Sequence, residues 1–114
     1  MNVLEVAVYA MVIGNPTQPI KCVESGLGTV NCTNGLAAKA IERDGIKFSN
    51  GVAIIKSPGL TLSNGIVAHL DSAGWLEFSN GISVHRDSQY RFRLNNGYTC
   101  LLVERTMAEC QDGR

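Results

Sequence analysis

The chain has 114 residues, the size of one domain, and its 10 Lys and Arg residues balance its 10 Asp and Glu residues. Hydrophobic residues make up 45% of the chain, which argues against disorder, and the absence of a block of like charge argues against nucleic acid as a partner. The 12 glycines, four cysteines and 18% charged residues indicate a turn-rich β protein.

The N-terminal segment VLEVAVYAMVI, residues 3–13, is almost entirely apolar. It is too short to span a membrane and no basic residue precedes it, so it predicts neither a transmembrane helix nor a signal peptide. Its valines and isoleucine favour a buried strand that ends at Gly14, with a short buried helix as the alternative. Pro16 and Pro19 predict an extended connection, so residues 1–19 are expected to form a strand and a lead-in.

Residues 20–104 contain an internal repeat. Asn-Gly occurs five times, at successive intervals of 16, 14, 16 and 16 residues, starting from Asn34, Asn50, Asn64, Asn80 and Asn96. Apolar and polar residues alternate on both sides of each pair, which predicts short strands with one face toward a core. From Val30 to Cys100 the apolar positions are almost all even-numbered, so the even positions are expected to face inward.

The same alternation predicts the type of turn. Because the apolar positions before and after each Asn-Gly have the same parity, the loop must contain an odd number of residues. We therefore expect a three-residue loop that ends in a left-handed glycine, with Phe48 facing Val52 and Phe78 facing Ile82. Turns at the opposite ends of the strands are expected at Asp44-Gly45, Ser57-Pro58-Gly59, Ser72-Ala73-Gly74 and residues 86–89.

These features predict an all-β fold, an antiparallel meander of short strands closed into a barrel or sandwich and built on a repeat of about 16 residues. A sheet with one apolar face must close, stack or cover that face with another copy. The alternative is a β-solenoid, whose coils would stack the asparagines into a ladder. Residues 105–114 are expected to form a C-terminal tail, in which residues 105–110 are a candidate helix.

The four cysteines lie in two pairs of equal spacing, Cys22 with Cys32 and Cys100 with Cys110. Neither pair has the short spacing of a zinc site. Two interpretations stay open: free thiols that act as small core residues, or two disulfides with three connectivities to choose from. Paired cysteines would favour an extracytoplasmic location, and free cysteines a cytoplasmic one.

The outward, odd-numbered face carries a candidate ligand-binding site. The expected row consists of His69, Trp75, His85 and Arg91. This row follows from a strand register that pairs Ala68 with Leu76 and Val84 with Phe92. An exposed Trp beside His and Arg is typical of a residue that anchors a ligand or partner. The alternative interpretation is a set of solvated cross-strand pairs, with the Trp covering one end of the sheet.

A weaker arrangement is a metal site. Each histidine precedes an aspartate by two residues, which gives the ligand set His69, Asp71, His85 and Asp87. Imidazole and carboxylate ligands suit zinc or copper, although residues two apart on a strand share a face without converging. The chain has no nucleophile elbow and no phosphate-binding loop, so we nominate no catalytic residue.

The sequence therefore favours a non-catalytic β-repeat module that assembles with itself as a homo-oligomer or binds a protein partner. The first alternative is a ligand-binding β protein that uses the His, Trp and Arg row for a sugar or small anion. The second is a metal-binding protein or metal-dependent enzyme. No cofactor is implied, and neither a membrane span nor a nucleic-acid surface is expected.

Overall fold

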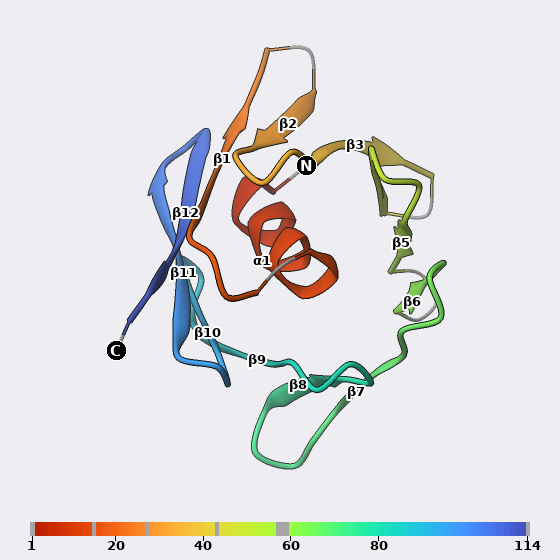
Figure 1. Cartoon of the computed structure of the whole chain (residues 1–114), viewed down its shortest axis with the longest axis vertical. Coiled ribbons are helices and arrows are strands. Elements are labelled where there is room, and N and C mark those ends of the chain that lie inside the picture. Colours follow the sequence, from red (N-terminus) through yellow and green to blue (C-terminus); the bar gives the residue numbers. More distant parts are fainter. Residues whose placement is uncertain (1, 15, 27, 43, 57–59, 114) are drawn as a thin grey trace.

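The computed structural model describes residues 2–14, 16–26, 28–42, 44–56 and 60–113. Twelve antiparallel strands form a nearly closed barrel around one helix, α1 (Val3–Ile13) (Figure 1). The strands are, in chain order, β1 (Ile20–Glu24), β2 (Thr29–Cys32), β3 (Ala37–Ile41), β4 (Gly45–Phe48), β5 (Ala53–Ile55), β6 (Thr61–Leu62), β7 (Ala68–Leu70), β8 (Trp75–Phe78), β9 (Ser83–Ser88), β10 (Arg91–Leu94), β11 (Tyr98–Glu104) and β12 (Met107–Asp112).

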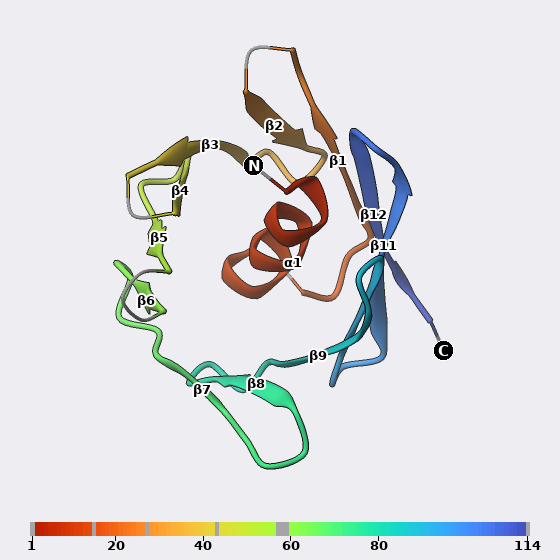
Figure 2. The same ribbon diagram turned by 180° about the vertical axis from the view of Figure 1, so that it is seen from behind.

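The sheet order is β6-β5-β4-β3-β2-β1-β12-β11-β10-β9-β8-β7. Every pair of neighbours follows in sequence except β1 and β12, whose antiparallel pairing joins the two halves of the meander. The sheet ends at β6 and β7, and no strand pairing joins these two in the described part of the chain; we call this gap the seam (Figure 2). The meander is confirmed, and the solenoid alternative is wrong because all neighbouring strands are antiparallel.

The predicted inward parity is confirmed. The fully buried apolar residues of the strands all have even numbers and face α1, and the same parity extends to residue 110. They are Ile20, Cys22, Val30, Cys32, Ala38, Ile46, Phe48, Ile54, Leu62, Phe78, Val84, Leu94, Tyr98, Cys100, Ala108 and Cys110. One face of the sheet thus forms the lining of the barrel, and the odd-numbered side chains form its outer surface. Toward the strand ends some even-numbered residues are exposed too, among them Leu70 on β7 and Arg86 and Ser88 on β9.

The predicted N-terminal strand is wrong, because residues 3–13 form α1 at the centre of the barrel. Nine of its 11 residues are buried, so the helix has no polar face and its sequence shows no helical periodicity. The signal was at its start: Asn2 Oδ1 accepts hydrogen bonds from the N–H groups of Leu4 (2.9 Å) and Glu5 (3.2 Å), as an N-cap does. Among the described residues no helix is long and apolar enough to cross a membrane.

The predicted C-terminal tail is also wrong in its structure. Residues 107–112 form β12, which lies between β1 and β11, and no helix occurs at residues 105–110. Ala108 and Cys110 continue the even-numbered inward pattern, and this explains why the segment completes the sheet. The sheet therefore continues beyond residue 104, where the repeat was predicted to end.

All four cysteines form disulfides, with the simplest of the three connectivities. Cys22 on β1 bonds Cys32 on β2, and Cys100 on β11 bonds Cys110 on β12, each pair directly opposite in the register. The bonds face inward, and the four strands that carry them contact α1. Each disulfide therefore fixes one strand of the central β1–β12 pair to its neighbour in the same half of the barrel.

The Asn-Gly turns have the predicted three-residue loops. The five glycines have φ values between 88° and 94°, the left-handed region that favours glycine. Phe48 N–H donates to the Val52 carbonyl (2.9 Å) and Phe78 N–H to the Ile82 carbonyl (2.8 Å), so the predicted facing pairs are confirmed. Ser72-Ala73-Gly74 forms a similar loop at the other end of the barrel, with φ 90° at its glycine. The turn predicted at residues 57–59 lies outside the described residues.

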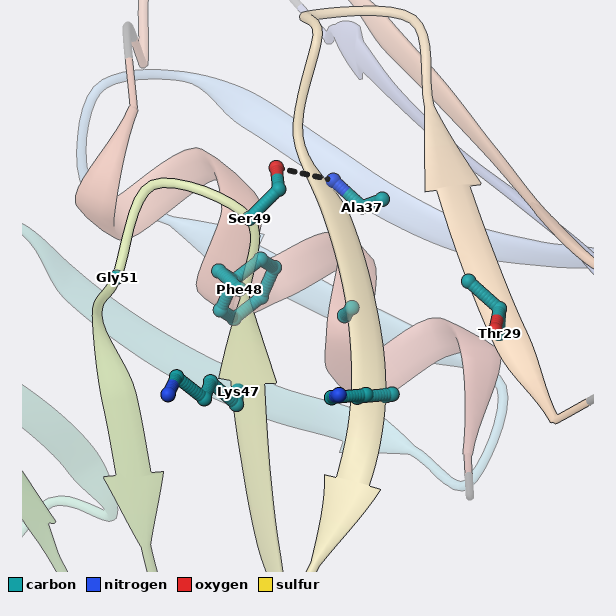
Figure 3. Close-up of a pocket in the computed structure, with 8 residues that line it drawn as sticks. Thr29, Ala37, Lys47, Phe48, Ser49 and Gly51 are labelled. Atoms are coloured by element: carbon teal, nitrogen blue, oxygen red, sulfur yellow. Dashed lines mark hydrogen bonds between the residues drawn. The ribbon is translucent and has the colours of Figure 1, made fainter.

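The residue before each asparagine connects one turn to the preceding hairpin. Ser49 Oγ accepts from the Ala37 N–H (3.0 Å), as Figure 3 shows, and Ser79 Oγ accepts from the Val67 N–H (3.0 Å). Thr33, Ser63 and Asn95 make the equivalent bond in their turns. A small polar side chain at this position therefore extends the ladder beyond the last backbone pair.

The repeated asparagines also hold the C-terminal end of α1. In all five turns the asparagine Oδ1 accepts from the N–H two residues later. In three turns the amide nitrogen donates inward as well: Asn34 to the Ala10 carbonyl (3.4 Å), Asn80 to the Val12 carbonyl (2.9 Å) and Asn96 to the Pro16 carbonyl (2.7 Å). Ala10 and Val12 lie in the last turn of the helix, where carbonyls run out of helical partners. The Ala10 carbonyl accepts from the Gly14 N–H (3.1 Å) as well as from the Asn34 amide. The barrel turns thus cap the helix.

Asn80→Asp should destabilise the protein, whereas Asn64→Asp should not. Aspartate can keep the bond from Oδ1 but cannot donate to Val12, and it adds negative charge near the negative end of the helix dipole. We expect a loss of about 1–3 kcal/mol in the free energy of unfolding for Asn80→Asp, measured by chemical denaturation.

Asn64→Asp is the matched control, because Asn64 forms the same turn bond and none to the helix among the described contacts. Equal losses in the two variants would contradict a capping role for the Asn80 amide.

Candidate functional site

The barrel interior leaves little room for a ligand because α1 fills it. A cavity of about 130 Å³ lies between α1 and β8–β10, among Tyr9, Phe78 and Phe92. A hollow of about 310 Å³ lies at the N-terminal end of α1, where Glu5 and Lys56 line it. The Tyr9 and Phe78 rings meet edge to face with centroids 6.4 Å apart. Burial raises the pKa of the Tyr9 hydroxyl, and the nearby Glu5 carboxylate raises it further. Pockets for drug-sized ligands measure about 300–1,000 Å³, so the cavity beside Tyr9 is too small for one.

The outer face of β8–β10 brings together most of the predicted row, in a different register. Trp75 lies directly opposite His85, as expected, but the next residue across is Arg93. His69 lies opposite Glu77 and not beside Trp75. His69 is therefore not part of the row, and Arg93 takes the position expected for Arg91.

Two of the predicted strand pairings are wrong by two residues. Ala68 lies opposite Phe78 because the β7–β8 loop comprises residues 72–74, one position later than the assumed register requires. Val84 lies opposite Leu94 because β9 continues through Ser88, with a bulge where Ser88 opposes Arg91. Both shifts preserve parity, so the pattern of apolar residues could not reveal them.

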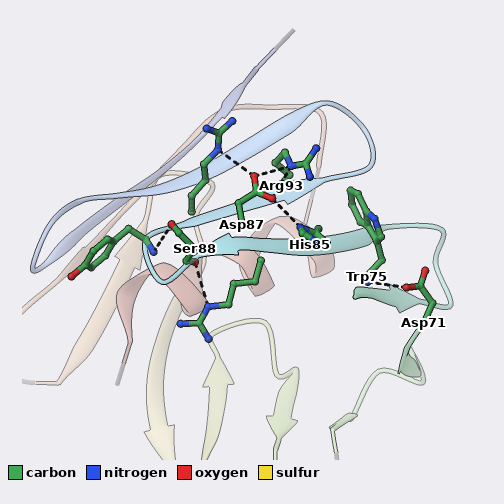
Figure 4. A network of polar contacts seen from close by, with 9 residues as sticks. Asp71, Trp75, His85, Asp87, Ser88 and Arg93 are labelled. Atoms are coloured by element: carbon green, nitrogen blue, oxygen red, sulfur yellow. Dashed lines mark hydrogen bonds and ion pairs between the residues drawn. The ribbon is translucent and has the colours of Figure 1, made fainter. Parts of the chain in front are cut away.

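Asp87 organises the polar contacts on this face (Figure 4). Its carboxylate contacts His85 Nδ1 at 2.9 Å and Arg93 Nε at 2.7 Å, and Arg91 Nε lies 3.5 Å away. We call Trp75, His85, Asp87, Arg91 and Arg93 the Asp87 cluster. The carboxylate thus holds two guanidinium groups and an imidazole in one arrangement.

Trp75 completes the cluster. Its ring lies 5.1 Å from the His85 ring, centroid to centroid, at an interplanar angle of 48°. The Arg93 guanidinium carbon lies 5.6 Å from the Trp75 ring centroid, within the range of a cation–π contact. The same arginine therefore contacts both the carboxylate and the indole, and this couples the position of Trp75 to that of Asp87.

A depression of about 340 Å³ adjoins the cluster. Its lining includes Trp75, Arg91 and Arg93 together with Asn95 and Thr99 on the neighbouring part of the sheet. The Arg91 and Arg93 side chains are 51% and 47% exposed, whereas the Asp87 side chain is only 23% exposed. A molecule in this depression would meet two cations and an aromatic ring before it met the carboxylate beneath them.

The predicted metal ligands do not converge. Within the described residues no group of three or more His, Cys, Asp or Glu side chains is placed to hold a metal ion. His69 Nε2 contacts Glu77 at 3.0 Å, and His85 contacts Asp87. Asp71 Oδ1 accepts from the N–H groups of Ala73 and Trp75, both at 2.9 Å, so this carboxylate stabilises its own turn.

A second depression of about 350 Å³ lies on the outer face of β2–β4 (Figure 3). Lys39 and Lys47 lie directly opposite each other there, and Thr29 and Ala37 complete much of the lining. Like charges in this position repel each other. This surface is basic, and Phe48 also borders it, but that ring is buried in the core and offers little surface to a ligand. In the described contacts no carboxylate orients the two lysines.

Sequence reasoning missed Arg93 and assigned Asp87 to a metal site. A signal was present, because Asp87, Arg91 and Arg93 flank one turn and have the same parity, which places them on the same face. Comparisons of the chain with protein-family models, with curated proteins and with solved structures found no match. The assignment of function therefore depends on the geometry of the site alone.

The cluster should make the stability of the protein depend on acid pH. Burial alone would raise the pKa of Asp87, but hydrogen bonds and charge from His85 and Arg93 outweigh it and lower the pKa below its ordinary value of 3.8. The stabilisation is therefore complete above pH 3.8 and is lost as the pH falls through the lower, folded-state pKa. Asp87→Asn should reduce the unfolding free energy near neutral pH, and the difference from the wild type should vanish in acid.

Thermal and chemical unfolding of both proteins across the acid range measures this difference. Glu104→Gln is the control, because it removes an exposed carboxylate on β11 outside the cluster. A difference between wild type and Asp87→Asn that stays constant down to the lowest pH would contradict the assigned role of the carboxylate.

Proposed function

We propose that this protein is a non-catalytic binding module whose Asp87 cluster binds an anionic carbohydrate, such as a uronic-acid or sulfated sugar. The observation that carries the proposal is the orientation of the two arginines. Asp87 engages Arg91 and Arg93 through their Nε atoms, and among the described contacts none uses their terminal Nη groups. Two guanidinium groups that are held in place and half exposed offer paired donors to a carboxylate or sulfate.

Trp75 supplies the second element of recognition. Its indole ring lies beside the arginines and borders the same depression. Indole is a large apolar surface with a polar edge, and such rings anchor ligands that have one apolar face. The C–H face of a sugar ring meets this requirement, and its anionic substituent would then reach the arginines.

The state of the carboxylate supports binding over catalysis. Asp87 contacts three donors and its pKa is lowered, so it is a poor proton acceptor near neutral pH. Its role in this proposal is to position the arginines. The ligand contacts are assigned to Trp75, Arg91 and Arg93.

Titration of tryptophan fluorescence and calorimetry would test the proposal with uronic-acid and sulfated oligosaccharides, and with a neutral oligosaccharide as the reference. The anionic sugars should bind and change the emission of Trp75, the only tryptophan in the chain. Arg93→Ala should weaken binding about tenfold or more, because a hydrogen bond to a charged group is worth about 1.5–3 kcal/mol. Trp75→Ala, measured by calorimetry because it removes the only tryptophan, should also weaken binding through loss of the apolar contact.

The matched control is the double variant Lys39→Ala with Lys47→Ala, which removes two cations from the other basic depression. It should leave the affinity nearly unchanged if the Asp87 cluster is the site. Equal weakening in the control would indicate non-specific attraction between charges, and no binding of any anionic sugar would refute the proposal.

The seam favours a second candidate function, self-assembly with another copy of the chain. β6 and β7 are both edge strands, and an edge strand presents unpaired backbone groups that can pair with another strand. Val67 and Leu70 at the β7 edge are 65% and 68% exposed. Two copies paired through β7 would form a two-fold dimer and cover these side chains.

Light scattering after size-exclusion chromatography would test self-assembly. The wild type should form dimers as its concentration rises, and Leu70→Lys should shift it to monomers because charge on an edge strand opposes pairing. Val103→Lys is the control, since Val103 is 50% exposed on β11, which has a neighbouring strand on both sides. A wild type that stays monomeric at high concentration would rule out this function.

The two disulfides support a further proposal, that the protein works in an oxidising, extracytoplasmic compartment. Disulfides persist in such compartments and are rare where thiols are kept reduced. An extracytoplasmic location also agrees with a carbohydrate ligand.

A further inference from the structure

We propose that Asn64 is a site of spontaneous modification, which deamidates to aspartate or isoaspartate before the other four Asn-Gly asparagines of the folded protein. Asparagine is a chemically labile residue, and the following glycine leaves the attacking backbone nitrogen sterically open. All five sites share the dipeptide, so the structure around each turn decides their order.

The reaction needs only water. The deprotonated backbone nitrogen of Gly65 attacks the side-chain carbon Cγ of Asn64, and a new C–N bond forms as the bond from Cγ to Nδ2 breaks and ammonia leaves. Water then adds to one of the two carbonyl carbons of the resulting five-membered imide and opens the ring. Opening on one side gives aspartate, and opening on the other gives isoaspartate, in which the main chain runs through Cβ.

The folded turns restrain this attack at both reacting groups. At every site the asparagine Oδ1 accepts a hydrogen bond from the N–H two residues later, and the glycine N–H donates to a carbonyl three residues before it. The glycine bond is longest in the third turn, 3.4 Å from Gly65 N to the Leu62 carbonyl, and it is 3.0–3.2 Å in the other four. Gly65 is therefore the least restrained of the five attacking nitrogens.

The leaving group is held at three of the sites. The amide nitrogens of Asn34, Asn80 and Asn96 donate to Ala10, Val12 and Pro16 in α1 and the segment after it. To react, these side chains must leave carbonyls that then lose a hydrogen bond. Among the described contacts Asn50 and Asn64 have no such bond, so these two remain as the reactive candidates.

Strand pairing separates Asn64 from Asn50. Phe48 N–H bonds to the Val52 carbonyl (2.9 Å) across the turn of Asn50, and β4 and β5 continue as a pair below it. The structure has no equivalent bond between Leu62 and Ile66, both of them described residues, and β6 and β7 do not pair. The turn of Asn64 is thus at the seam, where few interactions oppose local opening.

The product would change the surface at the seam. It adds a negative charge beside the two edge strands of a chain whose formal net charge is zero. The isoaspartate form also adds one backbone atom to a turn that no strand pair encloses. The fold can therefore accept the modification at Asn64, whereas at Asn80 it would place charge at the end of α1.

The test is to incubate the folded, disulfide-bonded protein in mildly alkaline buffer made with heavy-oxygen water, and to follow each Asn-Gly peptide by mass spectrometry. Asn64 should incorporate the heavy oxygen first, Asn50 next, and Asn34, Asn80 and Asn96 last. Asn64→Gln should remove the fastest reaction and leave the order of the other four unchanged.

The reduced chain in denaturant is the reference for intrinsic reactivity, and there the five sites should react at similar rates. Two results would overturn the proposal: another asparagine reacting before Asn64 in the folded protein, or no reaction at Asn64 under conditions in which the denatured chain reacts. Reaction at all five sites in the folded protein at the denatured rates would also do so, because the turns would then give no protection.

Discussion

The carbonyl groups at the C-terminal end of α1 impose the main constraint on this structure. They lie among buried residues inside a β-barrel, where an unpaired carbonyl is costly. The turns of the barrel help to meet this constraint by directing asparagine amides inward, to the Val12 carbonyl and to that of Ala10, which also accepts from the Gly14 N–H. Gly14 permits the approach, because a Cβ at that position would lie 2.7 Å from the Ala10 carbonyl oxygen and 3.0 Å from Asn34 Nδ2. An apolar helix can therefore occupy the centre of the sheet.

The same constraint explains why the repeat consists of a short polar residue, Asn and Gly. The short polar residue extends the hydrogen-bonded ladder to the preceding hairpin. The asparagine closes the turn, and in three cases it also bonds to the helix or the segment after it. The glycine adopts the left-handed conformation. Aspartate would satisfy the turn as well as asparagine, but it lacks the amide donor. The repeat is thus a feature of one end of the barrel, whereas the Asp87 cluster lies on the outer wall formed by β8–β10.

The parts of the fold that depend on parity could be predicted from the sequence, and the parts that depend on register could not. Alternation determined the strands, the inward face and the three-residue loops, because each wrong choice would have exposed Phe48 or Phe78. The helix was predicted only as the alternative to a strand, because burial on every side removes the periodicity that identifies helices. The Asp87 cluster was missed because a shift of two residues preserves parity and yet replaces Arg91 by Arg93 opposite His85.

The seam gives the barrel an adjustable circumference. A fully closed barrel has a diameter determined by its strand number and stagger, whereas a sheet with two free edges can open or narrow without breaking a backbone hydrogen bond. The width of this barrel is therefore determined by what lies inside it. On the side of β1 and β12 the helix meets a wall locked by two disulfides, so a bulkier side chain there would have to displace fixed strands. Toward the seam, the same added volume would simply spread β6 and β7 farther apart.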